Sequence, residues 1–153
     1  MQEAVDKINR VMIIDDDEVD QMVYQRIIKR SDMVEEFVAF TYAEEALEYL
    51  KSNPKTNVDV IFLDINMPRM NGFEFLERAV EDLGDQFTSA VVIMLTTSLD
   101  PRDVERARQF EVVKKYLDKP LQIEDLREVA ALLRESADSS FLRSEQSDRG
   151  AVA

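Results

Sequence analysis

The sequence VDVIFLD occupies residues 58–64, an apolar run that ends in Asp64. A loop rich in helix and strand breakers, NMPRMNG, follows at residues 66–72. A second apolar run, VMII at residues 11–14, ends in three aspartates at positions 15–17. If the two runs are neighbouring parallel strands, their carboxylates meet at one sheet edge and repel one another unless a cation lies among them. The pattern predicts an acidic pocket with Asp64 at its floor, suited to Mg²⁺ and phosphoryl chemistry.

The composition limits the chemistry that such a pocket can perform. The chain has 153 residues, which fits one domain with a substantial core. It has no cysteine and no histidine, so disulfides, thiolate zinc sites and histidine as a general base are excluded. Carboxylate and carbonyl oxygens favour Mg²⁺, Mn²⁺ or Ca²⁺, and we expect Mg²⁺ with Mn²⁺ as the alternative.

Charge and hydropathy bear on partners and location. The net charge of −13 makes for solubility and argues against nucleic acid or an anionic membrane as a partner. No apolar stretch approaches the roughly 18 residues that span a bilayer. The first six residues, MQEAVD, lack the basic start and apolar core of a signal peptide. We therefore expect a cytoplasmic protein.

Short apolar runs alternate with amphipathic stretches along the chain. The expected strands are residues 10–14, 36–40, 58–63, 90–95 and 112–117, and the expected helices are residues 18–30, 43–51, 74–83, a helix beginning at Asp100-Pro101, and 123–135. Five strand–helix units predict an α/β fold with a doubly wound, five-stranded parallel sheet. Lys114 and Lys115 favour an edge position for the last strand. Residues 1–8 are expected to form an N-terminal arm and residues 136–153 a flexible tail, which leaves residues 9–135 as the folded domain.

In such a sheet, ligands bind outside the carboxyl ends of the strands. Polar residues follow four of the expected strands, namely residues 15–17, Asp64, residues 96–97 and Lys119. We expect all of them to project from the same sheet edge. Their convergence is a stronger signal than any one motif.

With these motifs the chain resembles the receiver domain of two-component response regulators, in particular the stand-alone, chemotaxis-like receivers. The resemblance covers residues 9–135, and its motifs are IIDDD at 13–17, LDINMPRMNG at 63–72, MLTTS at 94–98 and YLDKP at 116–120. It implies a flavodoxin-like (βα)5 fold with strand order 2-1-3-4-5.

The resemblance also implies a role for each polar residue. Asp64 would accept a phosphoryl group from a histidine kinase or a histidine phosphotransfer protein. Lys119 and the Thr96 hydroxyl would contact phosphoryl oxygens. The metal ligands would be Asp15, Asp16, Asp64 and the backbone carbonyl of Asn66.

The resemblance further implies a conformational switch. When Thr96 turns toward the phosphoryl group, Tyr116 would turn inward and remodel the surface formed by the helix after Pro101, strand 112–117 and helix 123–135. Tyr116 could equally be a half-buried aromatic residue on an edge strand. The chain lacks the glycine that many relatives carry before this strand, so the preceding helix must end without a left-handed glycine. A cis peptide bond before Pro120 is also implied.

Each candidate residue has a simpler structural explanation. The aspartates at positions 15–17 could cap the following helix, and Asp17 is the best placed because it directly precedes Glu18. Asp64 could open the Pro-Gly loop as an Asx turn. Thr96 and Thr97 could both be ordinary strand residues; the register of the resemblance favours Thr96 as the functional residue and Thr97 as the structural one. Lys119 could be a plain surface lysine.

We expect a stand-alone receiver that acts through protein contacts with an output protein that the sequence does not identify, as a monomer or as a phosphorylation-dependent homodimer. Its kinase or phosphotransfer partner is expected to dock beside helix 18–30, where Met22, Val23 and Ile27 cannot all be core. Two alternatives remain open, a phosphate sink and a pseudo-receiver that binds partners without phosphorylation. We do not expect an enzyme, apart from self-phosphorylation and self-dephosphorylation. A Mg²⁺-dependent phosphohydrolase is a third and weaker alternative, because the haloacid dehalogenase-like class needs a second acid where this chain has Asn66.

Overall fold

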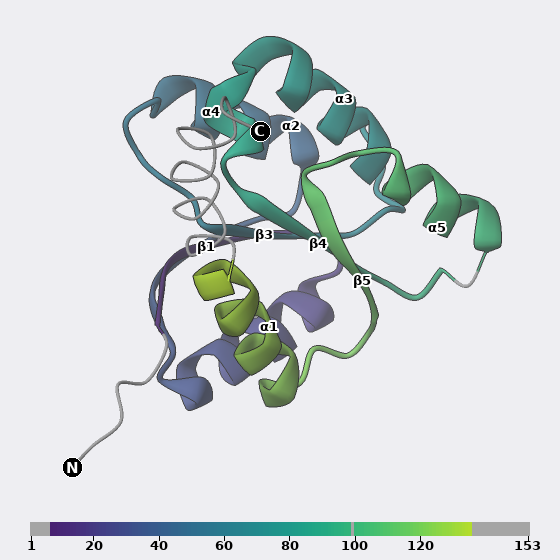
Figure 1. Ribbon diagram of the computed structural model, residues 1–153. Helices are drawn as coiled ribbons and strands as arrows, with labels where there is room; N and C mark the ends of the chain where they lie inside the picture. The colour runs from purple at the N-terminus through teal and green to yellow at the C-terminus, as the bar shows by residue number, and fades with distance from the viewer. Residues whose placement is uncertain (1–6, 99, 136–153) are drawn as a thin grey trace, which may run out of the picture.

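The computed structural model describes residues 7–98 and 100–135, which form one five-stranded sheet with helices on both faces (Figure 1). The strands are β1 (Ile8–Ile14), β2 (Val34–Phe40), β3 (Val60–Leu63), β4 (Val91–Thr96) and β5 (Val113–Asp118). The helices are α1 (Glu18–Ser31), α2 (Ala43–Ser52), α3 (Gly72–Leu83), α4 (Asp85–Thr88) and α5 (Pro101–Arg108), and residues 123–135 are also helical.

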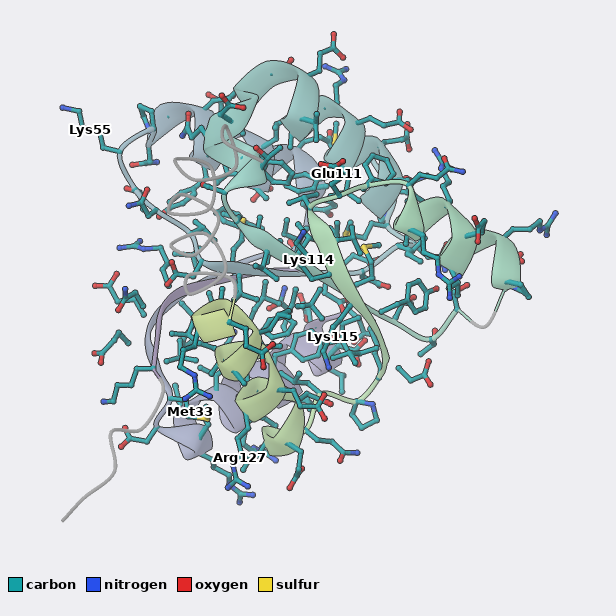
Figure 2. All side chains as sticks on the ribbon, in the orientation of Figure 1. Met33, Lys55, Glu111, Lys114, Lys115 and Arg127 are labelled. Carbon is teal, nitrogen blue, oxygen red and sulfur yellow. The ribbon has the colours of Figure 1, made fainter. Side chains whose placement is uncertain are left out.

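The strand order is β2-β1-β3-β4-β5, and all neighbouring strands are parallel. This confirms the predicted doubly wound, flavodoxin-like fold. Because all five strands run in one direction, their carboxyl ends lie along a single edge of the sheet. Lys114 and Lys115 lie on the edge strand β5, as predicted (Figure 2). The Lys115 ammonium pairs with Glu128 at 2.7 Å and so ties this edge to helix 123–135.

Strand β3 shows why the central strands appear in the sequence as continuous apolar runs. Val60 and Phe62 belong to the core under α1 and helix 123–135, whereas Ile61 and Leu63 belong to the core under α2, α3 and α5. Figure 1 shows these two groups of helices on opposite sides of the sheet. A strand that is covered on both faces has no polar face, so its hydrophobic pattern does not alternate.

Several element ends differ from prediction by one or two residues. Strand β1 begins at Ile8, inside the expected arm, because Ile8 is fully buried and its N–H donates to the Met33 carbonyl at 2.7 Å. Asp59, predicted near a strand start, precedes β3, and its Oδ2 accepts the Asn9 N–H at 2.9 Å. Residues 1–6 of the expected arm and the expected tail 136–153 lie outside the described residues.

Helix α4 was not predicted, because four residues are too few to show a helical period. Gly84, with a φ of 56°, ends α3 and directly precedes α4. Helix α3 begins two residues earlier than expected. Asn71 and Glu74 form a reciprocal capping box there, in which each side chain accepts the other residue's backbone N–H.

Helix α5 has the predicted start and end. The Asp100 side chain accepts the Arg102 N–H at 2.9 Å as the N-cap, and Gln109 ends the helix in a right-handed conformation, without a left-handed glycine. The peptide bond between Lys119 and Pro120 is cis, as expected. Across residues 7–98 and 100–135, every helix is too short or too polar to cross a membrane.

Candidate functional site

Three of the predicted site residues meet at the carboxyl edge of the sheet. Asp15 follows β1, Asp64 follows β3 and Lys119 follows β5, and all three side chains are 10% exposed or less. The Lys119 ammonium lies 2.7 Å from Asp15 Oδ2 and 3.2 Å from Asp64 Oδ2. The Lys119 N–H also donates to the Thr96 carbonyl at 3.1 Å, which fixes the end of β5 against β4. Lys119 is therefore not a plain surface lysine.

Asp16 completes an acidic cluster with Asp15 and Asp64. One carboxylate oxygen from each lies within 4.8 Å of the others. Asp15 and Asp64 are buried, whereas Asp16 is exposed. Three hard oxygen donors on one side of a partly open site fit Mg²⁺, which keeps several waters when it binds protein. Asn66, whose backbone carbonyl is a further expected ligand, lies two residues after Asp64 with its side chain exposed.

The acidic cluster brings like charges close together where Asp15 and Asp64 are buried. Burial raises the pKa of Asp64 above its ordinary value, and the Asp15 charge raises it further, although Lys119 and the Ile65 N–H act in the opposite direction. Burial would lower the pKa of Lys119, but hydrogen bonds to Asp15 and Asp20 outweigh it and hold that pKa above its usual range. Lys119 is therefore a permanent cation, and Asp64 is a carboxylate that gains from an added positive charge.

Hydrogen bonds fix both buried carboxylates. Asp15 Oδ1 accepts the Asp17 N–H at 2.9 Å, and Asp15 Oδ2 accepts the Tyr24 hydroxyl at 2.8 Å in addition to Lys119. Burial and the Asp15 charge raise the pKa of Tyr24, so its hydroxyl remains a donor. Asp64 Oδ1 accepts the Ile65 N–H at 2.8 Å.

Two residues at this site were not predicted from the sequence, Asp20 and Tyr24. Asp20 Oδ2 lies 2.6 Å from the Lys119 ammonium. Asp20, Tyr24 and Ile28 are spaced four residues apart, so they share one face of α1, and Tyr24 and Ile28 are buried on it. An acid on the core-facing stripe of a helix was the signal that could have identified Asp20.

The loop after Asp64 folds back onto the backbone of Asp64. The Gly72 N–H donates to the Ile65 carbonyl at 2.8 Å, and a Cβ atom at Gly72 would lie 2.4 Å from the Asp64 carbonyl oxygen. Only glycine fits at this distance. The same loop is anchored at the start of α2 by Arg69, whose guanidinium lies 4.2 Å from the ring centre of Tyr42, the N-cap residue of that helix.

Thr96 and Tyr116 have their hydrogen bonds with Ser98 rather than with the acidic cluster. Thr96 is fully buried, and its hydroxyl oxygen accepts the Ser98 N–H at 3.2 Å. The Tyr116 hydroxyl donates to the Ser98 carbonyl, also at 3.2 Å. Thr97 is exposed. Asp17 is the N-cap of α1, since its Oδ1 accepts the N–H groups of Val19 and Asp20.

Helix α1 presents apolar side chains to solvent beside this site. Of the three residues expected to share core and docking roles, Met22 is 62% exposed, Val23 is half-buried and Ile27 packs against the core. Val19, one turn before Met22 and Val23, is 67% exposed.

The family model of the response regulator receiver domain matches residues 11–131 of the sequence, and the chain belongs to this family. Over 120 residues it is 31% identical to the two-component response regulator ARR10 of Arabidopsis thaliana, a match that covers 78% of this chain and 20% of ARR10. Over 125 residues it is 27% identical to the two-component response regulator ORR1 of Oryza sativa subsp. japonica, a match that covers 78% of this chain and 53% of ORR1. The chain thus spans from about a fifth to about half of the length of these curated relatives.

Solved structures agree with the family. A two component response regulator from Cytophaga hutchinsonii has a TM-score of 0.79 and 30% identity, over 84% of this chain and 98% of that one. The chemotaxis protein CheY4 of Vibrio cholerae has a TM-score of 0.66 and 27% identity, over 82% and 98%. The chain is therefore a receiver domain of two-component signalling, a class of signalling phosphoacceptors.

Proposed function

We propose that this receiver accepts a phosphoryl group on Asp64 from the phosphohistidine of a histidine kinase or a histidine phosphotransfer protein. The observation that carries the proposal is the position of the Asp64 carboxylate, 3.2 Å from the Lys119 ammonium and beside the carboxylates of Asp15 and Asp16. A carboxylate attacks phosphorus when its charge is offset and the leaving group lies in line. Residues 1–153 contain no histidine, so the donor histidine lies outside this sequence.

In this reaction an Asp64 carboxylate oxygen forms a bond to phosphorus while the phosphorus–nitrogen bond of the donor breaks. The electron pair of that bond returns to the imidazole nitrogen. The Ile65 N–H keeps the carboxylate oriented, and Lys119 donates to a phosphoryl oxygen as a point charge, joined by the Thr96 hydroxyl. Bound Mg²⁺, or Mn²⁺, would offset the negative charge of carboxylates and phosphoryl oxygens. The residues that would hold the ion are Asp15, Asp16, Asp64 and the backbone carbonyl of Asn66.

The proposed switch connects Thr96 to Tyr116 through Ser98. If the Thr96 hydroxyl turns toward a phosphoryl oxygen, the Ser98 N–H loses its acceptor. The Ser98 carbonyl is also the acceptor of the Tyr116 hydroxyl. Movement of Ser98 would then reposition Tyr116. The surface formed by α5, β5 and helix 123–135 would change shape and signal to an output protein, as a monomer or through a homodimer.

The proposed docking site for the phosphodonor is the exposed apolar part of α1. Val19 and Met22 offer apolar contact area there, within one turn of Asp20, which touches Lys119. A Met22→Glu variant is expected to slow transfer from a histidine-phosphorylated phosphotransfer domain without slowing labelling by acetyl phosphate. Val80→Glu is the matched control, because Val80 is an exposed apolar residue of α3. Equal transfer to both variants would argue against docking on α1.

The central proposal is tested by incubating the protein with Mg²⁺ and acetyl phosphate and measuring its intact mass. We expect a gain of one phosphoryl group that Asp64→Asn abolishes. No gain with Mg²⁺ or Mn²⁺ would identify a binding module that acts without phosphorylation. Sustained release of phosphate over many turnovers would instead identify a phosphohydrolase. If phosphorylation leaves the spectroscopic signal of Tyr116 unchanged, a phosphate sink would be favoured over a messenger.

A further inference from the structure

Three carboxylates surround the Lys119 ammonium, which has three N–H donors to share among them. Its nitrogen lies 2.6 Å from Asp20 Oδ2, 2.7 Å from Asp15 Oδ2 and 3.2 Å from Asp64 Oδ2. Asp64, the proposed phosphoacceptor, has the longest contact of the three, and Asp20 has the shortest. The ammonium is thus fully engaged before any phosphoryl group arrives.

Asp20 reaches Lys119 from a helix, whereas Asp15 and Asp64 follow strands. An acid at the third position of a helix commonly accepts the backbone N–H of the N-cap residue. In α1 that N–H belongs to Asp17, and it donates to Asp15 Oδ1 at 2.9 Å instead. The Asp20 side chain turns to Lys119, 99 residues further along the chain. Capping of α1 therefore does not account for the position of the Asp20 carboxylate.

The ion pair between Asp20 and Lys119 is sheltered from solvent. The Lys119 side chain is 10% exposed and the Asp20 side chain is 30% exposed. Salt screens partly buried charges much less than it screens exposed ones. Asp20 therefore attracts the Lys119 ammonium effectively at ordinary ionic strength.

We propose that Asp20 is a positioning residue of the phosphoryl site, which holds Lys119 toward α1 and competes with the phosphoryl group for its ammonium. The proposal rests on the phosphorylation of Asp64 argued above. When phosphorus bonds to Asp64, Lys119 must redirect a donor from the Asp64 carboxylate to a phosphoryl oxygen. Asp20 opposes that redirection because it attracts the same ammonium. It also favours cation binding, because it partly neutralises Lys119 and leaves the acidic cluster with more net negative charge.

The two effects of Asp20 have opposite signs, which makes them testable with one variant. Asp20→Asn keeps the shape of the side chain and removes its charge. We expect Mg²⁺ affinity to fall on the order of fivefold and the rate of labelling by acetyl phosphate at saturating Mg²⁺ to rise on the order of fivefold. Calorimetry with Mg²⁺ alone measures the affinity, and intact mass over time measures the rate. A residue that only stabilised the start of α1 would not shift the two in opposite directions.

Glu18→Gln is the matched control. Glu18 is exposed in the same first turn of α1, so this change removes an equal charge from the same helix. Both the Mg²⁺ affinity and the labelling rate are expected to stay close to those of the wild type. Asp20→Glu, which restores the charge, is expected to return both toward the wild type. Thermal unfolding establishes that each variant is folded.

The outcomes separate this inference from the proposed function. If the wild type is labelled at Asp64 and Asp20→Asn behaves as Glu18→Gln does, or is labelled more slowly than the wild type, Asp20 does not compete for Lys119 and the inference is overturned. A wild type that gains no phosphoryl group refutes the proposed function instead. The Mg²⁺ titration then still tests the interaction of Asp20 with Lys119. An Mg²⁺ affinity that is unchanged in Asp20→Asn overturns the inference, whereas an affinity that falls in Asp20→Asn but not in Glu18→Gln supports it.

Discussion

Asp64→Asn is expected to stabilise the metal-free protein although it removes the proposed phosphoacceptor. Asp64 is 7% exposed, and a carboxylate oxygen of Asp15 and one of Asp16 lie within 4.8 Å of its own. Asparagine has nearly the same shape, and its side-chain oxygen can still accept the Ile65 N–H. The substitution therefore removes a buried charge, together with the acceptor that Asp64 Oδ2 offers the Lys119 ammonium at 3.2 Å.

The magnitude follows from the distances. At 4.8 Å and an effective dielectric constant of about 20, two like charges repel by about 3.5 kcal/mol, and the Lys119 ammonium at 3.2 Å attracts Asp64 by about 5 kcal/mol. Two repulsions against one attraction leave a net cost of about 2 kcal/mol, to which burial adds. Asp16 is exposed, so solvent weakens its share. We expect Asp64→Asn to gain about 1–2 kcal/mol, or about 3–6 °C in melting temperature.

The pH dependence gives the sign of the effect a second test. The folded protein raises the pKa of Asp64 above its ordinary value of 3.8, so in the window between these two values it binds more protons than the unfolded chain does. The stability of the wild type therefore falls as pH rises through that window. The advantage of Asp64→Asn is expected to be absent below the ordinary carboxyl pKa and complete above the raised one.

The assay is thermal or urea unfolding in EDTA at low salt and neutral pH, followed by circular dichroism. Glu81→Gln is the control for net charge, because Glu81 is exposed near the far end of α3. Added Mg²⁺ is expected to stabilise the wild type more than Asp64→Asn. An Asp64→Asn protein that unfolds at or below the wild-type temperature in EDTA would refute the argument from charge repulsion.

Three further substitutions probe the support of the site. Gly72→Ala places a Cβ 2.4 Å from the Asp64 carbonyl oxygen, so we expect a loss of about 2 kcal/mol in urea unfolding and slower labelling of Asp64; wild-type values for both would contradict the steric argument. Tyr24→Phe removes the 2.8 Å hydrogen bond to Asp15, at an expected cost of about 1.5 kcal/mol in the same assay, and an unchanged unfolding midpoint would show that this bond adds nothing. Lys119→Met leaves the carboxylates without an ammonium, so calorimetry is expected to show Mg²⁺ affinity rising on the order of tenfold while labelling slows; weaker Mg²⁺ binding would contradict this.

The fold was predictable because the central strands β3 and β4 are buried on both faces. A run such as residues 60–63 has no polar face to interrupt it, so it stands out in the sequence, and the resemblance supplied the strand order. The strand ends were less predictable. Strand β1 begins at Ile8, but Asn9 and Arg10 follow at its start, where Asp59 accepts their backbone N–H groups. That pairing depends on a residue fifty positions away, which no local pattern shows.

Some residues of the candidate site could likewise be predicted from the sequence, and others could not. Parallel strands bring their carboxyl ends to one edge whatever their exact packing, so Asp15, Asp64 and Lys119 could be placed together from the sequence. Asp20 and Tyr24 could not, because their contacts depend on how α1 is rotated against the sheet. The helical spacing of these two residues shows a shared face but not which residue of the sheet edge that face meets.

The proposed function and the role of Asp20 depend on the same imbalance of charge. In the described part of the chain, the Lys119 ammonium pairs with the carboxylates of Asp15, Asp20 and Asp64, and Asp16 adds a fourth negative charge beside Asp15 and Asp64. A site selected only for stability would replace some of these acids, as Asp64→Asn is expected to show. The excess of negative charge instead makes the site responsive, because a divalent cation relieves it and a phosphoryl group requires Lys119 to change partners. On this argument, the charge of Asp20 acts on both responses. It strengthens cation binding, and it opposes the movement of the Lys119 ammonium from Asp64 to the phosphoryl group.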